Sequence, residues 1–279
     1  MSTGRAYVHG ESLASHDDWC SHLEAMQTSQ LPWDLAAILL LLGIAVPWRG
    51  AVRVRALLAR SALTSTERIA IYGSTIAFQW ILSGLTVWRC VARGWSLASL
   101  GIALADRRTA IGIGLALASI LALVQFAAFR QFGRVAPERR GRLAEIALKL
   151  MPQNLIEALP FVALVCTVSV CEEFLYRGFV FAAFQRVFGG SAVAAILGSS
   201  ILFGIGHFYQ GRRGVANTFV LGAIFAGVRF WTGSLAPSIL AHLAVDLMAG
   251  LGGSRWATSQ KQAEAAVASM GGSAPPSNS

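Results

Sequence analysis

The chain has 279 residues, of which 55% are hydrophobic and only 13% are charged, and its net charge is +9. A soluble domain carries about 25% charged residues, so this composition excludes an ordinary soluble protein. The basic residues fall mainly between apolar blocks, as topology signals do. Because no basic face with interleaved aromatic residues is present, we expect no nucleic-acid binding. The sequence therefore predicts a polytopic integral membrane protein.

Several apolar blocks reach the length of about 17–25 residues that crosses a bilayer. We predict an all-α transmembrane helix bundle of about seven spans, with six to eight as the range, at 32–48, 69–88, 109–129, 157–176, 190–208, 214–231 and 235–252. The polar segment 1–31 contains a single basic residue, Arg5, and no apolar core, which disfavours a cleavable signal peptide.

The connecting segments differ in character. Residues 95–104 are too short to cross a bilayer and are expected to be interfacial or re-entrant. Residues 136–151 have basic and apolar faces at helical spacing, which fits a helix along the headgroups or an ordinary connecting helix. Residues 32–154 hold the first spans and their basic loops. The tail, 253–279, lacks apolar periodicity, and we predict that it is disordered.

Loop charges favour one orientation of the chain in the membrane. Basic residues concentrate between the first and second spans and between the third and fourth, so these loops should be cytoplasmic and the N-terminus outside. Four further arginines in the loop between the second and third spans count against this orientation: Arg89, Arg93, Arg107 and Arg108.

Ionisable residues interrupt three of the apolar spans, at a cost of roughly 2.5–3.5 kcal/mol each near the bilayer centre. Positions four apart share a helix face, so each cluster presents its groups in one direction. Taken singly, each cluster could be a structural pair or a core histidine. Three such clusters together indicate one shared polar site, because buried ionisable groups are expensive. The clusters are Glu172, Glu173 and Arg177; His207, with Phe203 one turn earlier; and His242, with Asp246 one turn later.

Two kinds of chemistry remain open for these residue types. His207, His242 and Glu172 could supply a zinc site of two histidines and one glutamate, although no HExxH motif occurs. Alternatively, a buried glutamate can act as a general base on a water with help from a histidine, and this chemistry needs no metal.

The motifs EExxxR (Glu172, Glu173, Arg177), FxxxH (Phe203, His207) and HxxxD (His242, Asp246) occur in this order within transmembrane spans. This pattern resembles the CPBP family, which contains the type II CAAX prenyl endopeptidases and bacterial proteins described as bacteriocin-processing or Abi proteins. The resemblance covers residues 155 to about 250, within a predicted catalytic core at 155–252. It implies an intramembrane glutamic-type endopeptidase, from a family formerly classed among the metalloproteases, in a bacterial inner (cell) membrane.

The resemblance also implies a role for each motif residue. Glu172 would activate water and His207 would assist it, while Glu173 and Arg177 would shape the site and balance its charge. His242 and the residue at 246 would face the oxyanion. The CAAX protease branch has Asn at this last place, whereas this chain has Asp246, and an ionised carboxylate cannot donate a hydrogen bond.

Asp246 must therefore be protonated, or it must hold His242 in a tautomer that donates. No cofactor is implied, and zinc is not favoured. The implied partners are the lipid bilayer and a peptide or protein substrate presented at the membrane. The sequence does not identify this substrate or show whether it is prenylated.

Two functions from other classes compete with the protease. Chains of Glu and His also mark ion pathways, so a proton-coupled transporter is an alternative, although we find no internal symmetry between halves of the sequence. The other alternative is a catalytically silent binding or immunity protein that keeps the fold. Peptide cleavage that survives chelation and depends on Glu172 would distinguish the protease from both.

Overall fold

The computed structural model describes residues 30–103, 106–132 and 141–271, and the regular structure in these ranges is helical, without strands. Within these ranges, six helices are long and apolar enough to cross a membrane, which confirms the predicted all-α bundle and makes the chain an integral membrane protein. They are Trp33–Leu58, Ser65–Ala92, Arg107–Gln131, Leu155–Val187, Arg212–Thr232 and Ala236–Arg255. The orientation in the membrane stays a prediction.

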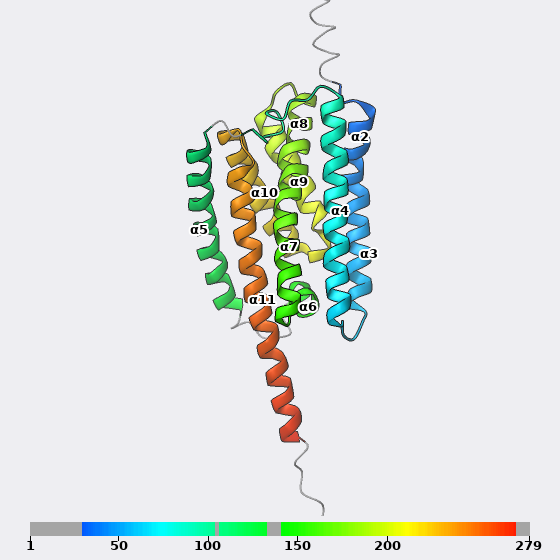
Figure 1. Cartoon of the computed structure of the whole chain (residues 1–279), viewed down its shortest axis with the longest axis vertical. Helices are drawn as coiled ribbons and strands as arrows, with labels where there is room; N and C mark the ends of the chain where they lie inside the picture. The colour runs from blue at the N-terminus through cyan, green and yellow to red at the C-terminus, as the bar shows by residue number, and fades with distance from the viewer. Residues whose placement is uncertain (1–29, 104–105, 133–140, 272–279) are drawn as a thin grey trace, which may run out of the picture.

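The helices run side by side along the long axis of the molecule (Figure 1). α4 (Ser65–Ala92) packs along α7 (Leu155–Glu172), and α5 (Arg107–Phe132) packs along α11 (Ala236–Gly271). α9 (Ala192–Gly206) pairs with α10 (Arg212–Thr232). With 15 residues, α9 is about 22 Å long, which is shorter than the hydrocarbon core of a bilayer.

The first span is a continuous rod made of α2 (Trp33–Leu40), the π-helical η1 (Leu41–Ala45) and α3 (Val46–Leu58). The sequence predicted that this span ends at residue 48 and that a basic loop follows, so the prediction of its end was wrong. The arginines beyond residue 48 lie on the helix because arginine is a good helix former with a long apolar stem.

α4 begins with a capping box in which Thr64 and Glu67 satisfy each other's backbone N–H groups. In its first turn, Arg68 is buried and donates from Nε to Oε2 of Glu157 at 2.8 Å. Glu157 lies in the first turn of α7, where the Asn154 side chain caps the helix. This buried ion pair ties the starts of α4 and α7 together, so the two helices hold a fixed register.

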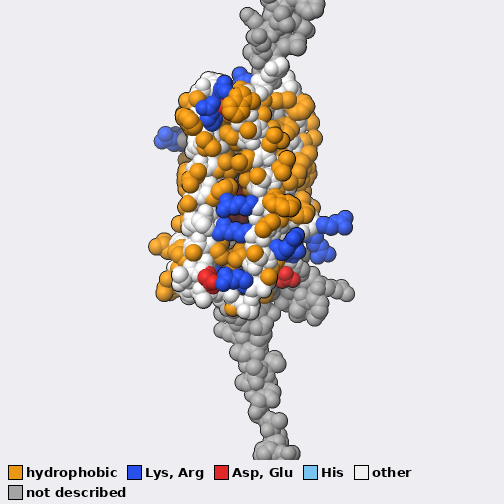
Figure 2. All heavy atoms as spheres, turned by 90° about the vertical axis from the view of Figure 1, so that its right-hand side faces the viewer, with side chains coloured by type: hydrophobic (Ala, Val, Ile, Leu, Met, Phe, Trp, Pro, Cys, Tyr) orange, Lys and Arg blue, Asp and Glu red, His pale blue; other side chains and the backbone are white. Residues whose placement is uncertain are grey.

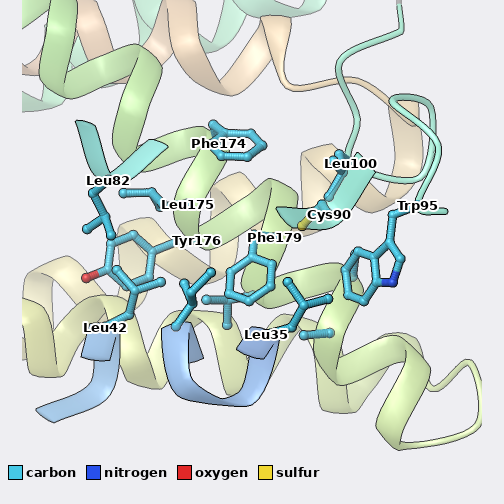
Figure 3. Packing of buried hydrophobic residues seen from close by; sticks show 14 of the residues in the cluster. Leu35, Leu42, Leu82, Cys90, Trp95, Leu100, Phe174, Leu175, Tyr176 and Phe179 are labelled. Carbon is cyan, nitrogen blue, oxygen red and sulfur yellow. The ribbon is translucent and has the colours of Figure 1, made fainter. Parts of the chain in front are cut away.

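The helix that begins with α7 continues through the π-helical η3 (Glu173–Val180) into α8 (Phe181–Val187). All side chains of η3 are buried. Figure 3 shows how Tyr176 and Phe179 from η3 pack against Leu35 and Leu42 of the first rod, with Trp95 beside Phe179. The π-helical segment is therefore the centre of the largest apolar cluster, and its position relative to the first span is fixed.

Residues 95–103 form turns that fold back onto the helix ends, while residue 104 of the same predicted segment lies outside the described residues. Trp95 and Leu100 are buried, and the Leu235 N–H donates to the Gly101 carbonyl at 2.9 Å. Gly101 has φ +74°, and a Cβ there would lie 2.3 Å from Nε of Arg229. A side chain at this turn would collide with that guanidinium group, so the turn requires glycine.

Of two further predicted segments, the first is helical as expected and the second differs from its expected form. Helix α6 (Gly141–Leu150) occupies most of the amphipathic segment, and Lys149 donates to the carbonyls of Leu57 and Leu58 at the end of α3; residues 136–140 lie outside the described residues. Residues 253–271, expected to be disordered, continue α11 as a helix (Figure 1). Their alanines and glutamines are good helix formers, which explains the difference.

Candidate active site

The two adjacent glutamates stand at the junction of an α-helix and a π-helix. Glu172 is the last residue of α7 and Glu173 the first of η3. π-helical turns are rare and occur frequently at functional sites. Because neighbouring residues on a helix point in different directions, the two carboxylates reach different partners.

Glu172 has one carboxylate oxygen held and one without a hydrogen-bond partner. Gln79, on α4, donates from Nε2 to Oε1 of Glu172 at 3.1 Å. Oε2 is buried and accepts no hydrogen bond from the described residues. It lies 3.8 Å from Nε2 of His207, and both side chains are 14% exposed. The glutamate is thus fixed in direction while one oxygen stays available to a proton.

His207 caps the C-terminal end of α9, just before the short 3₁₀ helix η4 (Phe208–Gln210). Its Nδ1 lies 2.9 Å from the backbone carbonyl oxygen of Phe203. Because a carbonyl only accepts hydrogen bonds, Nδ1 must carry the proton. In the neutral ring Nε2 is then an acceptor, and it faces Glu172. The Phe203 ring, 4.6 Å from the imidazole centroid, supports this orientation.

Glu173 is fully buried between two nitrogen donors. Arg177 donates from Nη1 to Oε1 at 2.9 Å, and Nδ1 of His242 lies 2.9 Å from the same oxygen. The Arg177 guanidinium is also fully buried and lies over the Phe203 ring, 3.9 Å from its centroid. Glu173 therefore joins its own helix to α11 by a charged contact in the protein interior.

His242 stands between two carboxylates. While its Nδ1 faces Glu173, its Nε2 lies 3.6 Å from Oδ2 of Asp246, one turn later on α11. The exposed fraction of the side chain rises from 0% at Glu173 to 9% at His242 and 32% at Asp246. The polar cluster thus runs from the fully buried Glu173 to the more open Asp246.

Small residues bring the helices close enough for these contacts. A Cβ on Gly198 of α9 would lie 2.2 Å from Cδ1 of Phe184 in α8. A Cβ on Gly222 of α10 would lie 3.2 Å from Cα of Ser200 and from Nη2 of Arg177. α9 therefore packs closely against α8 and α10 at these glycines.

The structure brings together every site residue that the sequence singled out in the spans. Their roles, and the water-filled cavity that peptide hydrolysis requires, stay predictions. The sequence interpretation missed Gln79, because only charged residues and histidines were counted within the apolar spans. A side-chain amide inside the predicted span 69–88 is also a polar group at membrane depth. It indicates a polar site as the charged residues do, but more weakly because it carries no charge. The residues brought together are Glu172, Glu173, Arg177, Phe203, His207, His242 and Asp246.

The described residues contain no group of three His, Cys, Asp or Glu side chains arranged to hold a metal ion. Nδ1 of His207 is engaged by a backbone carbonyl and Nδ1 of His242 by Glu173. The remaining Nε2 atoms face Glu172 and Asp246, respectively. The zinc site that the sequence left open would use these Nε2 atoms, since a metal-bound histidine commonly donates its other ring N–H to a carbonyl or a carboxylate.

The fold and the cluster define a polytopic membrane protein with an ionisable site inside its helix bundle. Residues 154–248 match the family model described as "Type II CAAX prenyl endopeptidase Rce1-like". This part of the chain therefore belongs to the Rce1-like type II CAAX prenyl endopeptidases of the CPBP family, as the motifs indicated. No match was found among curated proteins or among solved structures.

Proposed function

We propose that the chain is an intramembrane glutamic-type endopeptidase that hydrolyses a peptide bond of a protein or peptide presented at the membrane. The observation that carries this proposal is the arrangement of Glu172: one oxygen is fixed by Gln79, and the other is unpartnered and faces Nε2 of His207. The family match at residues 154–248 supports the same class of reaction.

In the proposed first step, Glu172 and His207 orient the attacking water. A separation of 3.8 Å between Oε2 and Nε2 is too long for a direct hydrogen bond and suits a bridging water. Both atoms are acceptors, so each can receive one hydrogen from the same water, which directs a lone pair of its oxygen at the scissile carbonyl carbon. Glu172 takes the proton as the C–O bond forms, and later gives it to the leaving amine as the C–N bond breaks.

In the same step, His242 would stabilise the oxyanion. Because Nδ1 faces Glu173, a donor at Nε2 requires the doubly protonated ring. The carboxylates of Glu173 and Asp246 on either side of the imidazole favour that form. Asp246 would act through its charge on His242, so it needs no hydrogen bond of its own to the oxyanion. Glu173, which is held by Arg177, would orient the imidazole ring of His242 through its contact with Nδ1.

The test is to identify which proteins change length when the gene is deleted and to restore it with either the unsubstituted chain or Glu172→Gln. We expect the unsubstituted chain alone to restore processing. Purified protein should then cleave the same substrate in lipid bilayers. Restoration by Glu172→Gln would favour a binding or transport function over a protease.

A further inference from the structure

Two arginines of α3 lie on the face that meets α4. Arg49 and Arg53 are four residues apart and therefore share a helix face. The Arg49 guanidinium lies over the ring of Phe78, 4.8 Å from its centroid, and Arg53 donates from Nη2 to Oγ of Ser74 at 2.6 Å. Figure 2 shows basic side chains among apolar ones just below the middle of the face on the side where α3 and α4 lie.

The charges of this pair have no counter-charge among the described residues. Like charges four apart on a helix repel each other, and arginine is costly inside a bilayer. Neither guanidinium has a carboxylate partner among the described residues, whereas the neighbouring cations Arg60, Arg68 and Arg89 each have one. Since a guanidinium carries five N–H donors, the pair keeps most of its hydrogen-bonding capacity available for an anion.

Snorkelling toward the headgroups is the ordinary explanation for arginines near the end of a span. It accounts for Arg55, which is exposed on the same helix. It does not account for the contacts of Arg49 and Arg53, because both reach sideways to α4.

Helix α3 has two indirect links to the proposed active site. Phe78, under Arg49, precedes Gln79, which holds Glu172. On the other side, a Cβ on Gly50 of α3 would lie 3.7 Å from Tyr209, whose ring centroid is 5.8 Å from that of His207. α3 therefore contacts the chain neighbour of Gln79 and a ring that lies beside His207.

We propose that Arg49 and Arg53 bind a carboxylate of the substrate and thereby select which peptides are presented to Glu172. The proposal rests on the endopeptidase function proposed above. A carboxylate offers two oxygens that match the planar guanidinium group and can bridge two of them. It can come from the free C-terminus of the substrate or from an acidic side chain. Both arginines lie outside residues 154–248, so the family match does not assign this role.

The test measures binding separately from cleavage, in the Glu172→Gln background and in bilayer discs of neutral phosphatidylcholine. The probes are one dye-labelled farnesylated peptide of neutral sequence with a C-terminal acid, the same peptide with a C-terminal amide, and the amide with one added aspartate. We expect a carboxylate-bearing form to bind about tenfold or more tightly than the neutral amide. Tighter binding of the peptide with the C-terminal acid would identify the C-terminus as the source of the carboxylate. Tighter binding of the amide with the added aspartate would identify an acidic side chain.

Substitution then tests the two arginines. Arg49→Gln combined with Arg53→Gln should reduce the affinity for the carboxylate form to that for the neutral amide. Lysines at both positions should keep part of the preference, since they keep the charge and lose the planar fork. The matched control is Arg55→Gln, which removes an equal charge from an exposed position of the same helix and should leave the preference unchanged.

Three outcomes would overturn the inference: no preference for either carboxylate form, an equal loss in Arg55→Gln, or a preference that is lost once anionic phosphatidylglycerol is added, because the lipid would then occupy the pair. Cleavage is measured in parallel with Glu172 present. If Glu172→Gln cleaves as fast as the unsubstituted chain, the proposed protease mechanism fails, while the binding comparison still decides the role of the arginine pair.

Discussion

Oε2 of Glu172 and Nε2 of His207 face each other at 3.8 Å, although the two residues belong to different helices. The other polar atom of each side chain is held by a hydrogen bond: Oε1 of Glu172 accepts from Gln79, and Nδ1 of His207 donates to the carbonyl oxygen of Phe203. A pair of oriented acceptors at this spacing suits a bridging water, and it provides the first prediction.

Glu172→Gln should give a folded, membrane-inserted and inactive protein. The amide keeps the shape of the side chain and cannot take a proton from water, so we expect turnover to fall about a hundredfold or more. The measurement is the cleavage rate of the substrate in bilayers, beside the thermal stability of the detergent-solubilised protein. Near-normal turnover in this variant would contradict the role of Glu172 as the base.

Gln79→Met should lower turnover without abolishing it. The substitution keeps the length of the side chain and removes the hydrogen bond to Oε1 of Glu172, so the carboxylate is less often aimed at the water. We expect about a tenfold loss in kcat with KM nearly unchanged.

A matched control for Gln79 is Thr75→Val, one turn earlier on the same helix. Its hydroxyl donates only to the Ile71 carbonyl of its own helix, so kcat should be preserved. A change in KM alone for Gln79→Met would assign Gln79 to substrate binding.

The sequence predicted the all-α bundle from the length of its apolar blocks. It predicted the members of the polar site because ionisable groups in a membrane are costly enough that three separate clusters must meet. Spacing also predicted that Glu173 and Arg177 share a face, and they are in contact at 2.9 Å. The charge and periodicity of single segments were sufficient for these conclusions.

Other features could not be predicted from the sequence because they depend on tertiary packing. The contact between Glu173 and Arg177 is compatible with an α-helix, so nothing in the sequence indicated the π-helix that begins at Glu173. Gln79 is uncharged, and its importance follows only from its position beside Glu172. Arg49 and Arg53 fit a basic loop in the sequence, and only the helix that continues to Leu58 places them beside α4.

The proposed chemistry predicts that activity does not require zinc. Cleavage should persist after exhaustive chelation, because the water is activated by Glu172 and His207. The measurement combines cleavage rate with the metal content of the purified protein. Zinc bound in a one-to-one ratio, lost when His207 or His242 is replaced and needed for turnover, would overturn the glutamate mechanism.

The last prediction separates the two glutamates by stability. Glu173 is fully buried, and its carboxylate is paired with the fully buried Arg177 and with His242. Glu173→Gln would leave the guanidinium unpaired in the protein interior, which costs about 3–5 kcal/mol. We therefore expect a large loss of thermal stability or expression together with the loss of activity, in contrast to Glu172→Gln.

A double-mutant cycle on this pair provides the sharper measurement. Arg177→Met alone should also destabilise the protein, whereas Glu173→Gln combined with Arg177→Met should cost less than the sum of the single changes, because no uncompensated arginine remains. As a control, Glu67→Gln removes the exposed ion pair with Arg60 while an amide can still cap α4, and it should change stability little. If Glu173→Gln is inactive but fully stable while Glu172→Gln keeps near-normal turnover, the base is Glu173 and the two roles are exchanged.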